Sequence, residues 1–310
     1  MATGLTLKEL SKKEMLLTAG HRMCAGCGAP IVVKMVLLAS EYPLIAANAT
    51  GCLEVSTCIS EYTAWKIPWI HNAFENAAAT ISGVETMYRS LKKQGKIDKE
   101  IKFIAFGGDG GTYDIGLQSL SGAMERGHDM LYVCYDNGAY MNTGIQRSSA
   151  TPFGADTTTC PAGDVIQGKP QQRKDMTRIM AAHGIPYVAQ ASPSHWMDLM
   201  KKVRKALDIK GPKFMNIISP CNRGWRSRTD DAIMLSKLAV ETCYWPLYEI
   251  ENGVTKVTFK PKEKKPLKDF IKPQGRFKHL FSPENEGMLK TFQEMIDREW
   301  EALLKASGAE

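Results

Sequence analysis

A strand–turn–helix–strand pattern in the middle of the 310-residue chain is the feature that most constrains its fold. Residues 101–106 form an apolar run, and a run of glycines interrupted only by Asp109 follows it. Residues 115–126 have the pattern of a helix, and residues 130–135 form a second apolar run. Two buried strands joined through a helix are typical of a parallel β-α-β unit. The sequence therefore predicts an α/β fold built on a mostly parallel sheet.

The same alternation of strands and helices continues on both sides of this unit. Further strands are predicted at residues 43–47, 186–191 and 213–219, and further helices at 31–40, at 72–93 and from Ser192 onward. Helices that alternate with parallel strands cover both faces of a sheet. Residues 143–174 lack such a pattern, and a loop of this length inside a compact domain is usually functional or part of an interface. We predict one α/β domain over residues 1–225.

Residues 226–310 do not continue the alternation and are predicted to form a C-terminal extension. Residues 245–259 have the pattern of a β-hairpin that turns at Asn252-Gly253, and residues 281–305 have that of a charged helix. We expect this extension to pack on the first domain or on partner subunits.

Composition and charge exclude several classes of protein. Hydrophobic residues make up 44% of the chain and charged residues 24%, as in ordinary globular proteins. No apolar run is long enough to span a membrane, and the first residues have no apolar segment typical of a secretory signal. The net charge of +7 suits an acidic partner, but no nucleic-acid-binding signature accompanies it. We expect a cytoplasmic protein without a membrane or nucleic-acid partner.

The glycine-rich turn and the end of the next strand together predict a diphosphate–metal site. Glycines let backbone N–H groups approach a phosphate, and the helix that follows adds its dipole. Asp109 and Asn137 are oxygen donors of the kind that Mg²⁺ prefers, and both follow strands of the predicted parallel sheet. A lone Gly-Asp-Gly would also suit a tight turn with a solvated carboxylate. A dinucleotide-binding fold is the other alternative, but the turn lacks the G-x-G-x-x-G spacing.

Four of the eight cysteines lie in turns where elements begin or end. Cys24 and Cys27 form a C-x-x-C pair in a glycine-rich turn, whereas Cys52 and Cys221 stand singly. Thiols in a chain without a secretory signal are expected to be reduced. From the residues alone, an iron–sulfur cluster, a zinc ion or no metal at all remains possible. Cys134 lies inside an apolar strand and is predicted to be a core residue.

Six short motifs along the chain resemble those of one enzyme family. They are residues 20–28 (GHRMCAGCG), 49–52 (ATGC), 71–76 (HNAFEN), 107–111 (GGDGG), 140–144 (YMNTG) and 219–221 (SPC). In combination they resemble the β subunit of pyruvate:ferredoxin oxidoreductase, a member of the 2-oxoacid:ferredoxin oxidoreductases. The resemblance extends from about residue 5 to residue 303.

The resemblance implies a thiamine-diphosphate-binding fold and a set of cofactor ligands. It implies that a [4Fe–4S] cluster is held by Cys24, Cys27, Cys52 and Cys221, and Mg²⁺ by Asp109, Asn137 and the backbone carbonyl of Ala139. It further implies that thiamine diphosphate lies along Gly51, Cys52, Gly108, Asp109, Gly110, Gly111, Asn137 and Ala139, with Thr143 and Gly144 as weaker candidates. Asn142 would lie beside both the cofactor and the substrate, as the one catalytic candidate.

The resemblance also implies the reaction and the partners. The expected reaction converts pyruvate, coenzyme A and oxidised ferredoxin to acetyl-CoA, CO₂ and reduced ferredoxin. An α subunit would supply the glutamate that contacts the aminopyrimidine ring and much of the pocket for the small 2-oxoacid, and γ- or δ-type subunits would carry further iron–sulfur clusters. Three alternatives stay open: oxidation of oxalate without coenzyme A, a longer 2-oxoacid, and a non-redox thiamine enzyme with structural zinc.

Overall fold

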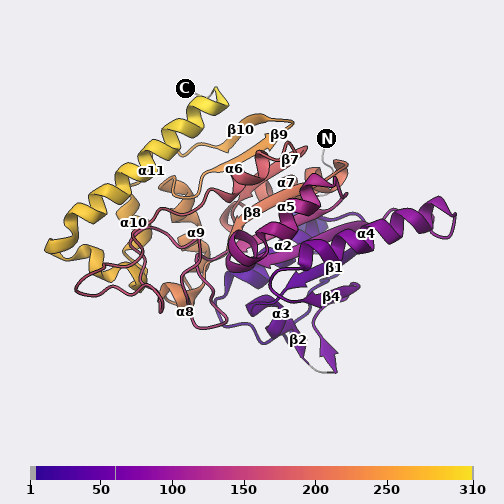
Figure 1. Cartoon of the computed structure of the whole chain (residues 1–310), viewed down its shortest axis with the longest axis horizontal. Helices are drawn as coiled ribbons and strands as arrows, with labels where there is room; N and C mark the ends of the chain where they lie inside the picture. The colour runs from indigo at the N-terminus through magenta and orange to yellow at the C-terminus, as the bar shows by residue number, and fades with distance from the viewer. Residues whose placement is uncertain (1–4, 60, 309–310) are drawn as a thin grey trace.

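A computed structural model describes residues 5–59 and 61–308, and an eight-stranded sheet forms its centre (Figure 1). The strands lie in the order β10-β9-β7-β8-β6-β5-β1-β4. Every neighbouring pair from β7 to β4 in this order is parallel. The strand β9 is antiparallel to β7, and β10 is antiparallel to β9. The bounds are β1 Leu44–Ala49, β4 Trp69–Asn72, β5 Lys102–Gly108, β6 Leu131–Asp136, β7 Tyr187–Ala191, β8 Lys213–Ile218, β9 Leu247–Glu251 and β10 Val254–Phe259; the separate pair is β2 Cys58–Ile59 and β3 Tyr62–Thr63.

Helices cover both faces of this sheet, as predicted. The helices α2 (Gly28–Ala39) and α7 (Trp196–Asp208) pack on one face, and α4 (Ala77–Lys93), α5 (Leu117–Glu125) and α6 (Met176–Ala181) pack on the other. Successive side chains of a strand point to opposite faces. In β5, Phe106 therefore belongs to the first layer and Ala105 to the second. Both layers are buried, which explains why the central strands are apolar throughout.

The C-terminal part extends the same sheet. The strand β9 pairs with β7, and the turn between β9 and β10 is formed by Asn252 and Gly253, whose φ angles are 48° and 82°. Asn-Gly suits this turn because both residues tolerate positive φ, so the predicted hairpin is confirmed. Beyond it, α11 packs against β10 (Figure 1). The remaining helices are α1 Leu7–Leu10, α3 Cys52–Thr57, α8 Asn222–Trp225, α9 Ala232–Glu241, α10 Leu267–Ile271, α11 Glu286–Ser307, the 3₁₀ segments Pro193–His195, Gly275–Phe281 and Pro283–Asn285, and the π-helix Gly110–Ile115.

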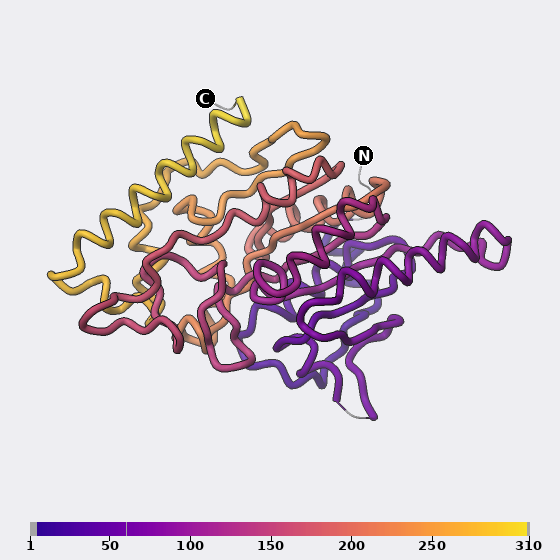
Figure 2. Tube along the Cα trace, viewed as in Figure 1, coloured from indigo at the N-terminus to yellow at the C-terminus, as the bar shows by residue number. Residues whose placement is uncertain are grey.

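A long irregular stretch joins β6 to α6 and lies beside the C-terminal part (Figure 2). Lys169 is buried and holds the stretch in place, because its Nζ donates to the carbonyls of Thr151 at 2.5 Å and Ser149 at 3.3 Å. On the outside, Arg226 Nη1 lies 2.6 Å from Asp156 Oδ2. The stretch is therefore an ordered part of the fold, and its role as a functional or interface segment stays a prediction.

Strand order creates a crevice at one place on the sheet. From β1 the chain crosses to β4 on one side, and from β5 it crosses to β6 on the other. Open α/β sheets bind ligands outside the carboxyl ends of strands at such a switch point. The segments that follow β1 and β5 contain Cys52 and Asp109, which are two of the predicted site residues.

Two differences from the predicted elements concern this region. The strand β4 was not predicted, because its four residues carry both apolar and polar side chains and lie at the sheet edge. The predicted helix over residues 115–126 is preceded by the π-helix, which begins directly after Asp109. Wide π-helical turns are frequent at functional sites. Within the described residues, no helix is long and apolar enough to cross a membrane.

Candidate active site

A cavity with an empty volume of about 330 Å³ lies at the switch point, at the carboxyl ends of β1, β5 and β6. Ten of the residues that the resemblance assigned to cofactor or metal binding line it: Gly51, Cys52, Gly108, Asp109, Gly110, Gly111, Asn137, Ala139, Asn142 and Thr143. Gly144 does not line the cavity, although it follows Thr143 directly. Asn142, the catalytic candidate, is exposed at the cavity. Residues from three distant stretches of sequence thus meet at one place.

Three oxygen atoms converge within the cavity. The side-chain oxygen of Asn137 lies 2.9 Å from Asp109 Oδ1 and 2.9 Å from the carbonyl oxygen of Ala139. Oxygens without a hydrogen between them repel one another unless a cation lies among them. Adjacent ligands of an octahedral Mg²⁺ are separated by about 2.9 Å, given bonds of about 2.0–2.1 Å. The three donors therefore fit a magnesium ion; without one, rotation of the amide would let its nitrogen donate to both neighbours.

Asp109 is held by short hydrogen bonds in a buried position. Its Oδ2 accepts from the Ser148 hydroxyl at 2.5 Å, and its Oδ1 accepts from the backbone N–H of Asn137 at 3.2 Å. Burial, and then the negative charge of Asp136, raise the pKa of the Asp109 carboxyl to about 7. A buried carboxylate of this kind is stabilised by a cation.

The wall of the cavity is closely packed around Gly110. A Cβ atom at Gly110 would lie 2.3 Å from the ring of Tyr140, whose hydroxyl donates to the Gly110 carbonyl at 3.0 Å. Only glycine fits there. The hydroxyl of Tyr135, in contrast, is buried at the cavity without a hydrogen-bond partner among the described residues. A buried polar atom without a partner is unfavourable, which suits a cavity that normally holds a polar ligand.

The four predicted cluster ligands gather beside this cavity. The N–H of Gly28 donates to the Pro220 carbonyl at 2.9 Å, which places the C-x-x-C turn against the turn that carries Cys221. The close approach requires glycine, because a Cβ at Gly28 would lie 2.8 Å from Pro220 N. Cys52 begins α3 and lines the cavity itself. The structure thus brings together thiols that are far apart in the sequence.

The thiols are close enough to influence one another's ionisation. Burial raises the pKa of Cys27 to about 12, that of Cys52 to about 11 and that of Cys221 above its ordinary value, and the negative charges of neighbouring thiolates raise them further. Buried thiols with raised pKa values are deprotonated when a positively charged centre binds them. Among the described residues, no three His, Cys, Asp or Glu side chains converge closely enough to hold a single metal ion.

The other four cysteines take no part in this group. Cys134 and Cys243 are buried, and Cys58 and Cys160 are half-buried. The prediction that Cys134 is a core residue is confirmed, since it is fully buried in the layer beneath α4, α5 and α6.

A tryptophan connects the thiol group to the three converging oxygens. The backbone N–H of Trp225 donates to the Cys221 carbonyl at 2.8 Å, and its indole Nε1 donates to the Asn137 carbonyl at 2.7 Å. The guanidinium of Arg276 lies 4.5 Å from the Trp225 ring centre. Both side chains are buried, and neither was predicted as a site residue. Their role depends on contacts between distant segments, for which the sequence carries no local signal.

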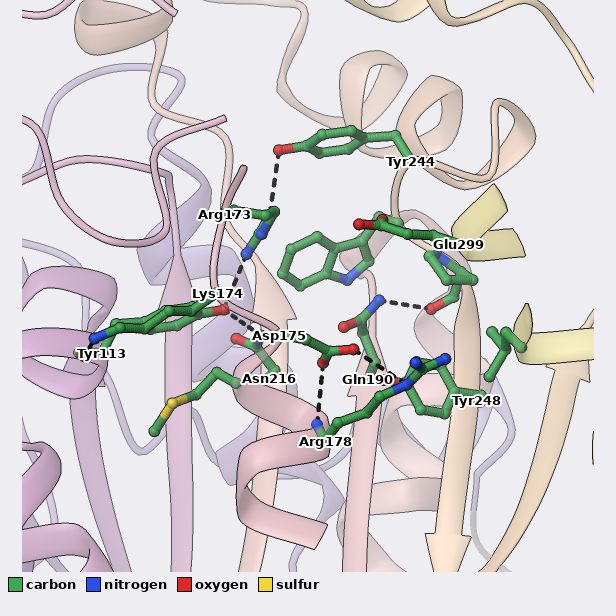
Figure 3. A pocket seen from close by; sticks show the side chains of 14 residues that line it. Tyr113, Arg173, Lys174, Asp175, Arg178, Gln190, Asn216, Tyr244, Tyr248 and Glu299 are labelled. Atoms are coloured by element: carbon green, nitrogen blue, oxygen red, sulfur yellow. Dashed lines mark hydrogen bonds and ion pairs between the residues drawn. The ribbon is translucent and has the colours of Figure 1, made fainter. Parts of the chain in front are cut away.

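A second network is centred on buried Asp136, the residue before Asn137, and Figure 3 shows two of its members, Tyr113 and Arg173. Asp136 Oδ2 accepts from Arg173 Nη2 at 2.5 Å and from the Tyr113 hydroxyl at 2.6 Å, and Oδ1 accepts from the Gly138 N–H at 3.1 Å. These bonds join the π-helix, the end of β6 and the long irregular stretch. They fix the turn from which the oxygens of Asn137 and Ala139 project. The Asp-Asn pair at a strand end was the only sequence signal for this network.

Comparisons with known proteins agree with this geometry. Residues 49–217 match the family described as "Thiamine pyrophosphate enzyme, C-terminal TPP binding domain". The chain is 57% identical to pyruvate synthase subunit PorB of Thermotoga maritima, over 96% of this chain and 94% of that protein. It is 56% identical to the same subunit of Methanocaldococcus jannaschii, over 91% of this chain and 95% of that protein.

Two further relatives have other substrates in their names. Ketoisovalerate oxidoreductase subunit VorB of Pyrococcus abyssi is 43% identical, over 93% of this chain and 92% of that protein. A 2-oxoglutarate:ferredoxin oxidoreductase from Magnetococcus marinus, solved with 2-oxoglutarate, coenzyme A and succinyl-CoA, shares the fold with a TM-score of 0.55 and 20% identity, over 71% of this chain and 77% of that one. The resemblance found in the sequence motifs is confirmed: the chain belongs to the thiamine pyrophosphate enzymes and, within them, to the family of pyruvate synthase subunit PorB.

Proposed function

We propose that this chain is the β subunit of a 2-oxoacid:ferredoxin oxidoreductase that oxidises pyruvate to acetyl-CoA and CO₂ and reduces ferredoxin. One observation carries the proposal: the cavity with three converging oxygens and the group of four thiols lie side by side and share Cys52. Thiamine diphosphate in the cavity would then lie next to an electron acceptor held by the same chain. The names of the most similar relatives support pyruvate as the substrate.

The residues of this chain have distinct tasks in the proposal. Asp109, Asn137 and the Ala139 carbonyl would bind Mg²⁺ and thereby the diphosphate, and Ser148 orients Asp109. Asn142, exposed at the cavity, would contact the substrate. When bound, thiamine diphosphate supplies the electron sink that lets a 2-oxoacid lose CO₂.

The thiols are proposed to hold a [4Fe–4S] cluster, which supplies a one-electron acceptor. Cys24, Cys27, Cys52 and Cys221 would each bind one iron. The hydrogen bond from Gly28 to Pro220, which joins the two cysteine-bearing turns, and the place of Cys52 at the cavity support one shared centre. A non-redox thiamine enzyme with structural zinc is the alternative of another class, and metal analysis separates the two: about four irons per chain for the cluster, zinc without iron for the alternative.

Partner subunits are part of the proposal. Asp109 is the only carboxylate that lines the described cavity, and no glutamate does so. An α subunit would supply the glutamate for the aminopyrimidine ring and much of the substrate pocket. Subunits of the γ and δ type would carry electrons from this cluster through further clusters to ferredoxin. The expected cytoplasmic location, without a membrane or nucleic-acid partner, stays a prediction.

A substrate panel tests the proposed reaction. The purified complex is given pyruvate, oxalate, 2-oxoisovalerate or 2-oxoglutarate, each with and without coenzyme A, and reduction of ferredoxin is followed. We expect the fastest reduction with pyruvate, and only when coenzyme A is present. Equal or faster reduction with oxalate in the absence of coenzyme A would favour the oxalate alternative instead.

A further inference from the structure

Arg276 is a buried cation without an acidic partner. It is 2% exposed, and no carboxylate within residues 5–59 and 61–308 forms an ion pair with it. Its hydrogen bonds go to neutral oxygens: Nε donates to Gln274 Oε1 at 3.0 Å, and Nη1 lies 3.4 Å from the Asn137 carbonyl. The guanidinium stays protonated in proteins. A buried charge without a counter-charge is strongly unfavourable. We therefore expect a bound anion beside Arg276.

A second arginine beside the site, the half-buried Arg173, shows the difference. Arg173 forms a 2.5 Å ion pair with Asp136, and that carboxylate is therefore already neutralised. Arg276 also stacks on two aromatic rings, at 4.5 Å from the centre of Trp225 and 5.0 Å from that of Phe277. These two ring contacts hold the guanidinium group in one position.

Arg276 lies close to residues of both proposed cofactor sites. Trp225, on which it stacks, contacts Cys221 through its backbone and Asn137 through its indole. The guanidinium carries a favourable electrostatic interaction with the Cys221 thiolate. A cluster bound by four thiolates is an anion, and it gains one more negative charge each time it is reduced.

We propose that Arg276 is the built-in counter-charge of the cluster site and raises the reduction potential of the cluster held by Cys24, Cys27, Cys52 and Cys221. This inference rests on the cluster proposed above. The step is the gain of one electron by the oxidised cluster, and no bond is formed or broken. In the reaction, that electron is one of two released by the 2-oxoacid. A nearby positive charge stabilises the reduced form more than the oxidised form, because the reduced form is the more negative.

The test is a reductive titration of the purified complex, monitored by electron paramagnetic resonance. The signal of this cluster is identified as the one that Cys221→Ser abolishes. We expect Arg276→Met and Arg276→Gln to disfavour its reduction by roughly tenfold, about 59 mV for a one-electron couple. Arg276→Lys keeps the charge and should keep most of the potential. Arg226→Gln is the matched control, since Arg226 is exposed, paired with Asp156 and only five residues beyond Cys221.

Several outcomes would overturn the inference. An unchanged potential in Arg276→Met, or equal shifts in Arg276→Lys and Arg276→Met, would show that the charge has no such role. Failure of Arg276→Met to assemble would also contradict it, because an apolar residue of similar volume should be tolerated where the cation lacks a partner. If Cys221→Ser abolishes no signal, the cluster proposal itself fails, which is a separate result.

Discussion

Individual side chains decide how the cavity can bind a metal. The motif residues Asp109 and Asn137 could be predicted because their chemistry and their place after strands are visible in the sequence. Ser148 could not, since it lies in a stretch without regular structure and its contact with Asp109 joins residues that are 39 positions apart. Arg276 lies 139 positions from Asn137, its hydrogen-bond partner. Site residues such as Ser148 and Arg276 can be recognised only once the fold is known.

Ser148→Ala should weaken magnesium binding without unfolding the protein. The Ser148 hydroxyl makes a 2.5 Å bond to Asp109 Oδ2, and residues that orient a metal ligand typically contribute 10- to 100-fold to affinity. We expect a loss of roughly tenfold in the apparent affinity for Mg²⁺ at saturating thiamine diphosphate, measured by titration of the metal-depleted complex.

Ser149→Ala is the matched control, because no hydrogen bond of the Ser149 hydroxyl is found among the described residues. If both variants bind Mg²⁺ as the unchanged protein does, Ser148 has no role in orienting Asp109.

At the scale of elements, the order of strands and helices was largely predictable, because apolar strands alternate with helical segments. The bounds of β5 and β6 differ from the predicted ranges by one or two residues. The edge strand β4 was missed, since four residues of mixed polarity carry little signal. The contact between the C-x-x-C turn and the Cys221 turn was implied only by the resemblance, and it depends on the absence of a side chain at Gly28.

Gly28→Ala should separate the two cysteine turns. The new Cβ would lie within 2.9 Å of backbone atoms of Pro220, and such overpacking costs about 1–3 kcal/mol. We expect the complex to lose most of the iron bound by this chain while it still binds thiamine diphosphate.

Gly287→Ala in α11 makes the same chemical change where no atom lies within 4 Å, so it should leave iron content unchanged. Full iron content in Gly28→Ala would contradict the proposed role of this contact.

Lys169 gives the long irregular stretch a measurable pH dependence. Burial lowers the pKa of Lys169 from 10.5 to about 8. Between these two pH values the unfolded chain binds more protons than the folded chain, so this residue makes stability rise as the pH increases. Below pH 8 the contribution is constant.

Lys169→Met removes the titration together with the bonds to three carbonyl groups. We expect a loss of about 1–3 kcal/mol in the free energy of unfolding at pH 7. The difference from the unchanged protein should grow as the pH is raised from 8 to 10, as thermal unfolding at each pH would show. A difference that stays constant over this range would argue against a depressed pKa.

At the scale of the molecule, the two proposed sites meet at the carboxyl ends of the strands of one sheet. The α/β class, the helices on both faces and the hairpin were all predictable from the sequence. In α4, Ala78 and Ile81 are buried, whereas Ala79 and Gly83 on another face are exposed.

The isolated chain should not turn over pyruvate. No glutamate lines its described cavity, and thiamine chemistry requires a group that helps to remove the C2 proton. We expect no ferredoxin reduction by the purified chain loaded with thiamine diphosphate and Mg²⁺, and full activity after the partner subunits are added. Turnover by the chain alone would mean that it holds a complete active site.

The central claim is that four thiols of this chain hold one iron–sulfur cluster beside the thiamine site. Iron and acid-labile sulfide are therefore measured in complexes carrying Cys24→Ser, Cys27→Ser, Cys52→Ser or Cys221→Ser, with Cys160→Ser and Cys58→Ser as controls. The account predicts that each of the first four loses about four irons per copy of this chain and that the two controls lose none. Iron content that is unchanged in the first four, or reduced equally in all six, would contradict it.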